Sequence, residues 1–248
     1  MRTPTTRGRR ALVILAVLVL CGSGLAAAGP WLLARAGIDR TALPWADPCS
    51  VRTAEGTVLL TVEEARLATT AAALRARGAE APDTSGIDPA VLDRLLHGPP
   101  DEPGPSLTCR ATDPDALAEQ DLTETGLTPR AQAVLDSVNE VFGPVSVGGY
   151  EPGGISTGHG EDSAHYDGRA IDFFYRPISE ENRREGWLLA HWLVAHAEKL
   201  HVANVIFDDE IWNARGSRGG WWPYVADDPD NAIMRHLDHV HVDVQEGG

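Results

Sequence analysis

Two short stretches of the chain combine histidine with aspartate at spacings that suit a metal ion. Residues 163–172 contain His165 and Asp172, and residues 236–241 add further imidazoles together with Asp238. Between them, the stretches supply two imidazoles and a carboxylate suited to Zn²⁺, and a second carboxylate placed to act on a metal-bound water. Three protein ligands with one open coordination position are typical of a catalytic zinc site. The pattern therefore predicts a zinc-dependent hydrolase.

For these side chains to meet, the chain has to turn tightly before a strand that carries one of them. Residues 170–175 are expected to form that strand, with Asp172 on it. Gly168 permits the tight turn, and the small side chain of Ala170 leaves space beside the site. His165 is then expected to approach the carboxylate from a loop.

The second stretch is expected to present two imidazoles on one side of a strand. His239 and His241 are two residues apart, a spacing that places both side chains on the same face. Asp238 points away from His241 on an ideal strand. A role for Asp238 as general base therefore requires the turn before Val240 to redirect its carboxylate.

The residues alone leave two alternatives open. The chain holds nine histidines, so some pairings arise by chance, and His159 in a glycine-rich loop is an alternative metal ligand. In the second alternative, His165, Asp172 and His241 are hydrogen-bonded core groups that hold no metal.

Hydrophobic periodicity and capping residues predict both helices and strands. We expect helices over 61–77, 89–97, 128–143 and 179–200, and strands over 57–61, 145–150, 170–175, 202–207 and 240–244. The Trp- and Gly-rich stretch 212–224 is expected to be a loop. Helices that alternate with a few strands, without the regular period of a parallel doubly wound fold, indicate a compact α+β domain over residues 127–248.

The N-terminal segment, residues 1–37, has the features of an export signal. Four arginines precede the apolar run 11–20, and the basic end of such a segment stays in the cytoplasm. Ala26-Ala-Ala28 offers a cleavage site, whereas the apolar residues 31–33 extend the run to the length of a membrane span. A single-pass membrane anchor and a cleaved signal peptide of a secreted protein both remain open. Either one places the rest of the protein outside the cytoplasm.

The chain after this segment is strongly acidic. The formal net charge is −15, and because residues 1–30 contain four basic residues and no acidic ones, the remainder carries −19. Such a charge disfavours binding to nucleic acid or to an anionic membrane surface. A hydrophobic fraction of 43% and seven tryptophans are sufficient for a substantial core.

Cys49 and Cys109 are the only cysteines outside the N-terminal segment. In an oxidising compartment such a pair is expected to form a disulfide, with two buried free thiols as the alternative. The disulfide would crosslink a small helical region, residues 44–110, in which no catalytic or metal-binding group of residues is recognised. Residues 111–126, rich in Asp, Glu and Thr, are expected to form a linker.

The two histidine-containing stretches resemble a known family pattern. The pattern in this chain is Ser163-x-His165-x-x-Gly168-x-Ala170-x-Asp172, followed by Asp238-x-x-His241. It is similar to the motif of the zinc D-alanyl-D-alanine carboxypeptidases and the phage L-alanyl-D-glutamate endolysins, which share their fold with the hedgehog signalling domain. The resemblance covers residues 128–245 and looks closest to an uncharacterised secreted actinobacterial branch of that fold.

The resemblance implies a single Zn²⁺ ion held by His165, Asp172 and His241. It implies that Asp238 is the catalytic acid or base, and that His239 is a second catalytic residue beside the metal. Peptidoglycan stem peptides are the substrate implied for an extracytoplasmic domain of this kind. Substrate contacts are expected from Ser163, Arg169, Trp221 and Tyr224, with the alternative that the loop of the two aromatic residues packs under the domain.

The chain departs from the family pattern at one turn. Family members usually have a Gly-Tyr-Arg sequence after the first strand, whereas this chain has Gly149-Tyr150-Glu151. The family arginine holds the substrate or the developing oxyanion, and loss of one oxyanion donor costs about 10²–10³ in rate. The candidates to replace it are Arg169, Arg215, Arg218 and Arg235. Two functions are therefore expected: a peptidase of the DD-carboxypeptidase or endopeptidase type, or a catalytically weak or inactive cell-wall-binding module that retains the zinc site.

Overall fold

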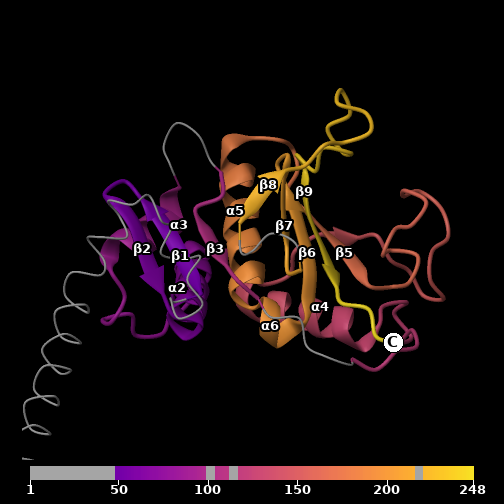
Figure 1. The fold of residues 1–248 in the computed structure, drawn as a ribbon, viewed down its shortest axis with the longest axis horizontal. Helices are drawn as coiled ribbons and strands as arrows, with labels where there is room; N and C mark the ends of the chain where they lie inside the picture. The colour runs from indigo at the N-terminus through magenta and orange to yellow at the C-terminus, as the bar shows by residue number, and fades with distance from the viewer. Residues whose placement is uncertain (1–47, 99–103, 112–116, 216–219) are drawn as a thin grey trace, which may run out of the picture. The chain divides into compact units, whose positions relative to one another are not determined.

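The structure, a computed structural model, describes residues 48–98, 104–111, 117–215 and 220–248 (Figure 1). The predicted export signal lies outside these residues. Within the described part of the chain, no helix has the length and apolar character that crossing a membrane requires. The helices are α2 (Val62–Ala76), α3 (Pro89–His97), α4 (Pro129–Phe142), α5 (Glu180–Ala195) and α6 (Ala197–Leu200). The strands are β1 (Cys49–Thr53), β2 (Gly56–Leu60), β3 (Leu107–Cys109), β4 (Val147–Gly148), β5 (Ala170–Phe174), β6 (Val202–Phe207), β7 (Glu210–Asn213), β8 (Trp221–Pro223) and β9 (His239–Val244).

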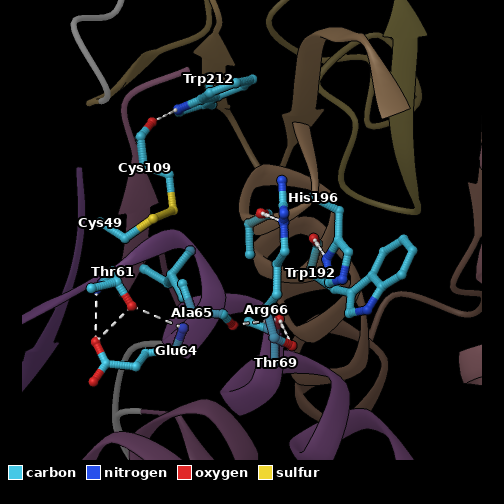
Figure 2. Close-up of a disulfide and its surroundings, with 12 residues drawn as sticks. Cys49, Thr61, Glu64, Ala65, Arg66, Thr69, Cys109, Trp192, His196 and Trp212 are labelled. Carbon is cyan, nitrogen blue, oxygen red and sulfur yellow. Dashed lines mark hydrogen bonds between the residues drawn. A yellow bond between two sulfur atoms is a disulfide. The ribbon is translucent and has the colours of Figure 1, made fainter. Parts of the chain in front are cut away.

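The N-terminal part of the described chain combines a small sheet with two helices. The sheet is antiparallel with the order β2-β1-β3, and its register places Cys49 opposite Cys109. The two cysteines form the predicted disulfide, shown in Figure 2. The strand expected over 57–61 is present as β2, and β1 and β3 are two further strands that were not expected in this small helical region.

Local sequence explains why α2 begins where it does. Thr61 accepts a hydrogen bond from the backbone N–H of Glu64, and the Glu64 carboxylate accepts one from the backbone N–H of Thr61 (Figure 2). This reciprocal capping box satisfies two backbone donors that the first helical turn would otherwise leave unpaired. The helix predicted over 61–77 is confirmed, with its cap.

The larger sheet has six strands in the order β4-β5-β9-β6-β7-β8, and all neighbours are antiparallel. Side chains alternate between its two faces. One face is apolar and lies against α5, with Phe173, Val205 and Val242 all buried. The opposite face carries the polar side chains of the candidate site. The mixture of helices and antiparallel strands confirms the expected α+β class.

Helix α5 packs against both parts of the described chain. It contacts β6 and β9 of the larger sheet, and also α2 and β3 of the N-terminal part (Figure 1). Every residue from Gly186 to Ala195 is buried, because neighbouring elements cover more than one side of the helix. A Cβ at Gly186 would lie 2.3 Å from the Phe207 ring, so glycine is needed for the close approach of α5 to β6.

Two expectations about the C-terminal half are wrong. The stretch 212–224 is not a loop throughout, because β7 and β8 pair within the larger sheet. The helix expected over 179–200 is interrupted at His196, which separates α5 from α6. The remaining predicted elements are present, although β4 is reduced to two residues.

Candidate metal centre

Two neighbouring strands bring the central carboxylate and imidazole together. In the antiparallel pair β5–β9, Asp172 lies directly opposite His241, and Phe174 lies opposite His239. Directly opposed residues project from the same face of a sheet. His239 and His241 both approach Asp172 Oδ1, with nitrogen–oxygen distances of 3.7 and 3.1 Å. The prediction that these histidines share a face is confirmed.

His165 enters the cluster from the turn before β5, and Gly149 gives it space. Its Nδ1 lies 2.8 Å from the carbonyl oxygen of Gly149, so Nδ1–H donates there and Nε2 keeps its lone pair. Gly149 has φ +82°, and a Cβ at that position would lie 2.3 Å from the His165 ring. Only glycine fits here without displacing the imidazole.

Three candidate ligand atoms converge at one point beside the sheet. His165 Nε2 lies 3.1 Å from His241 Nδ1, His241 Nδ1 lies 3.1 Å from Asp172 Oδ1, and His165 Nε2 lies 3.3 Å from Asp172 Oδ1. Ligands about 2.0–2.1 Å from a tetrahedral metal ion are roughly 3.3 Å apart, so the spacing fits such an ion. All three residues are buried.

The outer contacts of the imidazoles explain this orientation. His241 Nε2 lies 3.4 Å from Asp243 Oδ2, so a proton on Nε2 leaves the Nδ1 lone pair facing Asp172. Both Asp243 oxygens accept from Asn204 Nδ2 at 3.0 Å, and Asn204 Oδ1 accepts from Asn213. A series of hydrogen bonds therefore runs from Asp243 on β9 through Asn204 on β6 to Asn213 on β7, next to the candidate metal centre. These outer residues were not predicted, although Asp243 continues the two-residue spacing of the histidines.

Charge at the cluster favours a cation. Burial by itself lowers the pKa of His241, but hydrogen bonds to Asp172 and Asp243 outweigh it and raise the pKa to about 9. Burial raises the pKa of Asp172, whereas its contacts with His165 and His241 lower it well below the ordinary value. In both cases the carboxylates select a positively charged occupant, either a proton or a metal ion.

His159 lies beside the cluster on an exposed loop. His159, His165 and Asp172 form a group of residues that could hold a metal ion, with ligand atoms within 4.8 Å of one another. The His159 ring stacks on the His165 ring, with centroids 3.9 Å apart and planes 24° from parallel. Tyr166 holds its backbone, because the Tyr166 hydroxyl donates to His159 O and accepts from His159 N.

Asp238 and His239 form a pair next to the three converging ligands. His239 Nδ1 lies 2.7 Å from Asp238 Oδ1, and Arg176 Nε donates to Asp238 Oδ2 at 2.6 Å. Both carboxylate oxygens therefore have partners, while His239 Nε2 faces Asp172. Burial raises the pKa of Asp238, but His239 and Arg176 lower it below the ordinary value overall. Arg176, which the sequence analysis missed, also lies over the Phe174 ring at 4.0 Å.

His236 is a further imidazole in this cluster that was not assigned a role. Its ring lies 4.8 Å from that of His239 and 5.6 Å from that of His241. Its Nδ1 is buried without a hydrogen-bond partner. Tyr224, expected to contact substrate, packs edge-on against this ring at 4.9 Å and so lies at the border of the cluster.

The other residues expected to contact substrate form hydrogen bonds or packing contacts within the protein. Ser163 Oγ accepts from the backbone N–H of His165 at 3.4 Å. The Arg169 guanidinium donates to Asp167 and to the carbonyl oxygen of Val244. Trp221 packs on the α5 side of the sheet, where its Nε1 donates to Leu107 O and its ring lies 5.1 Å from that of Trp187.

The proposed replacements for the missing arginine have different positions. Arg235 is paired with Asp209, and Arg218 lies outside the described residues. Arg215 has an interaction of its own. Among the described arginines, Arg176 is the one bound to a predicted catalytic residue.

A family model matches part of the chain. Residues 123–233 are similar to the family described as VldE, C-terminal domain. The matched segment contains His165 and Asp172 and ends before Asp238 and His241. No curated protein and no solved structure matches the chain. The similarity therefore includes the first part of the ligand cluster and not the second.

Proposed function

We propose that this protein is an extracytoplasmic zinc-dependent peptidase that acts on peptidoglycan stem peptides, with the DD-peptidase/hedgehog type of fold. The observation that carries the metal assignment is the convergence of His165 Nε2, His241 Nδ1 and Asp172 Oδ1 at 3.1–3.3 Å. Two imidazoles and a carboxylate are a ligand set found in catalytic zinc sites. The reaction class and the substrate come from the motif resemblance.

The chain provides the ligands and fixes their orientation before any ion binds. Gly149 O and Asp243 each accept a ring proton, so the other nitrogen of each imidazole points at the site. His241, whose pKa is raised to about 9, releases its Nδ1 proton when a metal ion binds. When bound, Zn²⁺ supplies Lewis-acid activation of water and of a peptide carbonyl. Asp172 adds the single negative charge among the three ligands.

His239 is better placed than Asp238 to move the proton. Both Asp238 oxygens accept hydrogen bonds, from His239 and from Arg176, whereas His239 Nε2 points toward the ligand cluster. His239 Nε2 therefore accepts the proton of the attacking water and returns it to the leaving amine. Asp238 holds His239 in the required tautomer and stabilises its protonated form.

Arg176 is the candidate for the cationic role that the family assigns to the missing arginine. Its side chain is 48% exposed while its Nε holds Asp238, so its other guanidinium nitrogens remain accessible. An arginine at the border of the site suits the carboxylate of a stem peptide or a developing oxyanion. The chain thus has a cation near the site despite Glu151 in the turn.

The experiment compares zinc content with cleavage of purified stem peptides. His239→Ala is expected to keep stoichiometric zinc and to lower kcat by about 10²–10⁴, the contribution of a general base. Asp172→Asn is expected to lose zinc and activity together. Full activity of His239→Ala would refute its role, and a wild-type protein without zinc would refute the metal assignment.

The second candidate function is a wall-binding module that retains the zinc site. The departure at Glu151, where the family pattern has an arginine, favours it. Digestion of purified wall fragments separates the two functions. New amine termini support the peptidase, whereas binding without new termini supports the module.

A further inference from the structure

The row of residues that carries the candidate metal centre continues across the larger sheet to the edge formed by β8. Directly opposed residues of an antiparallel pair lie on the same face of a sheet. The registers of the pairs from β5 to β8 give one continuous row: Asp172, His241, Ile206, Ile211 and Trp222. Two candidate ligands occupy one end of this row, and three apolar side chains follow them.

The residues next to this row along the strands point to the other face, into the core. Val205 and Trp212 are buried there, and Trp221 packs against the same core. Because side chains alternate along a strand, the apolar part of the row faces away from α5, as the candidate ligands do. Trp221, expected from the sequence to contact substrate, thus lies on the α5 side, whereas Trp222 lies on the face of the candidate site.

The exposure of the apolar residues increases along the row toward β8. Ile206 is 9% exposed, Ile211 is partly buried, and Trp222 is 58% exposed. The surface that the row offers to a ligand is therefore its outer part, Ile211 and Trp222. Tryptophan is among the residues that contribute most to binding when a ligand covers it.

A line of rings on the same face leads from the candidate site to the end of β8. The His236 ring lies 4.8 Å from that of His239 and 4.9 Å from that of Tyr224. Tyr224 follows Trp222 by two residues, and its backbone N–H donates to the carbonyl oxygen of Asp209. The candidate site and the surface at β8 are thus connected by packed side chains.

We infer that Ile211 and Trp222 bind the part of the peptide substrate that is remote from the scissile bond, through its apolar side chains. This inference rests on the proposed function, because it concerns the same substrate. Neighbouring strands lie about 4.8 Å apart, so β8, three strands from β9, lies roughly 14 Å from it across the sheet. An extended peptide advances about 3.3–3.6 Å per residue, so Trp222 is in reach of a side chain about four residues from the ion.

The chemistry of the row favours a peptide over the glycan of the wall. The hydroxyl groups of a sugar need several polar partners, whereas the row beyond the candidate ligands consists of two isoleucines and an indole ring. The amides beside the row are already engaged, since Asn204 donates to Asp243 and Asn213 donates to Asn204. Small apolar side chains of a peptide match the surface of Ile211 and Trp222.

The test measures the binding of purified stem peptides of two to five residues by calorimetry. It uses the full-length protein after a chelator has removed metal ions, so that binding is measured apart from the proposed reaction. The wild-type protein is expected to bind the five-residue peptide about tenfold or more tightly than the two-residue peptide. Trp222→Ala is expected to remove most of this preference and to leave the affinity for the two-residue peptide unchanged.

Two further variants serve as controls. Trp222→Phe retains a flat apolar ring and is expected to keep most of the preference for the longer peptide. Ile178→Ala removes a side chain that is exposed to a similar extent, 53%, but lies on none of the strands of the sheet. It is expected to bind both peptides as the wild-type protein does.

The outcomes separate this inference from the proposed function. Equal affinities of wild type and Trp222→Ala for the five-residue peptide would overturn the inference, and so would binding by the wild type that does not depend on peptide length. Binding of a wall disaccharide without peptide, lost in Trp222→Ala, would assign the surface to the glycan and overturn it as well. Length-dependent binding without cleavage by the zinc-loaded protein would refute the proposed function alone.

Discussion

The orientation of each imidazole at the candidate metal centre decides which histidines are placed to bind an ion. His241 Nδ1 lies 3.1 Å from both His165 Nε2 and Asp172 Oδ1, the spacing of ligands around one ion. The His159 ring is stacked face to face on His165, and two rings bound to one ion do not stack so closely. His159 nevertheless has a ligand atom within 4.8 Å of those of His165 and Asp172, a looser spacing than that of His241.

This difference predicts unequal effects of removing the two histidines. His241→Ala is expected to weaken zinc binding by more than the roughly 10–100-fold typical of outer contacts, because a ligand is lost. His159→Ala is expected to change zinc affinity by less than about tenfold. Competition with a chromophoric chelator measures both. A larger loss in His159→Ala than in His241→Ala would assign the ligand set to His159, His165 and Asp172 instead.

Asp243 is predicted to act on the metal through His241. Asp243→Asn keeps the shape of the side chain but removes the charge that fixes the Nε2 proton. Zinc affinity is expected to fall by about 10–100-fold, as for other outer carboxylates. Asp93→Asn, at an exposed carboxylate on α3, is the matched control. Unchanged zinc affinity in Asp243→Asn would show that His241 is oriented without it.

The candidate ligands could be predicted from the sequence, whereas the residues that contact and orient them could not. Spacing and motif predicted His165, Asp172 and His241 as ligands, and the structure brings these three side chains together. Arg176 could not be found in this way, since its contact with Asp238 depends on a tertiary approach across 62 positions. Asp238 was assigned the role of base, and only its contacts reveal that both oxygens already accept hydrogen bonds.

At the scale of elements, the turn after β4 positions the first ligand. Gly149→Ala is expected to destabilise the fold by about 1–3 kcal/mol and to weaken zinc binding, because the new Cβ would lie 2.3 Å from His165. Gly153→Ala provides a matched control, since Gly153 also has positive φ (+89°) but no atom within 4 Å of its Cβ position. Urea unfolding and zinc titration of both variants separate backbone strain from collision with the imidazole.

If Gly149→Ala and Gly153→Ala lose equal stability and keep equal zinc affinity, the close approach to His165 has no effect. The loss of stability in both variants would then come from the positive φ alone.

Elements with strong local signals were predicted, and those that depend on partners were not. Capping residues Thr61 and Thr128 marked helix starts that the structure confirms. β3 is three residues long and exists through its pairing with β1, so no local pattern distinguishes it from a loop. The β7–β8 pair was missed because the Trp- and Gly-rich composition of 212–224 indicates a loop, while Trp212 and Trp221 are directly paired across the strands.

At the scale of the whole molecule, the disulfide connects strands of the small sheet that also contact the rest of the protein. Trp212 Nε1 donates to Cys109 O at 3.0 Å, and Arg66 Nε donates to Ala195 O at 3.2 Å (Figure 2). One continuous hydrophobic core includes Cys49 as well as Val205 of the larger sheet. Loss of the crosslink is therefore expected to lower the stability of more than the small sheet.

The cysteine pair provides the test. Cys49→Ala/Cys109→Ala is expected to lower the free energy of unfolding by about 4 kcal/mol, from the chain entropy of a crosslink that spans 60 positions. Urea unfolding followed by tryptophan fluorescence measures the change, and reduction of the wild-type protein serves as the matched condition. A single cooperative transition in both proteins indicates a shared core. A transition of the larger sheet that is unaffected by the crosslink would contradict this coupling.

Two buried histidines predict how stability depends on pH. Burial lowers the pKa of His191 to about 3 and that of His196 to about 4, with smaller contributions from neighbouring basic groups. In the unfolded chain a histidine has a pKa of about 6.5, so below that pH the unfolded state binds protons that the folded state does not. Stability is therefore retained above about pH 6.5 and falls as the pH drops toward 4, by about 2 kcal/mol per histidine at pH 5.

His196→Gln isolates one of these contributions. His196 Nδ1 donates to Trp192 O at 2.8 Å and its ring stacks on Trp192 (Figure 2), and a glutamine amide can still donate to that carbonyl. Urea unfolding of the chelator-treated protein at pH 7, 6 and 5 is expected to show a shallower loss of stability in His196→Gln than in wild type. His97→Gln, at an exposed histidine on α3, is the matched control for the loss of a histidine as such. Equal slopes in all three proteins would mean that His196 binds its proton in the folded state, and acid sensitivity would then have to come from the buried carboxylates.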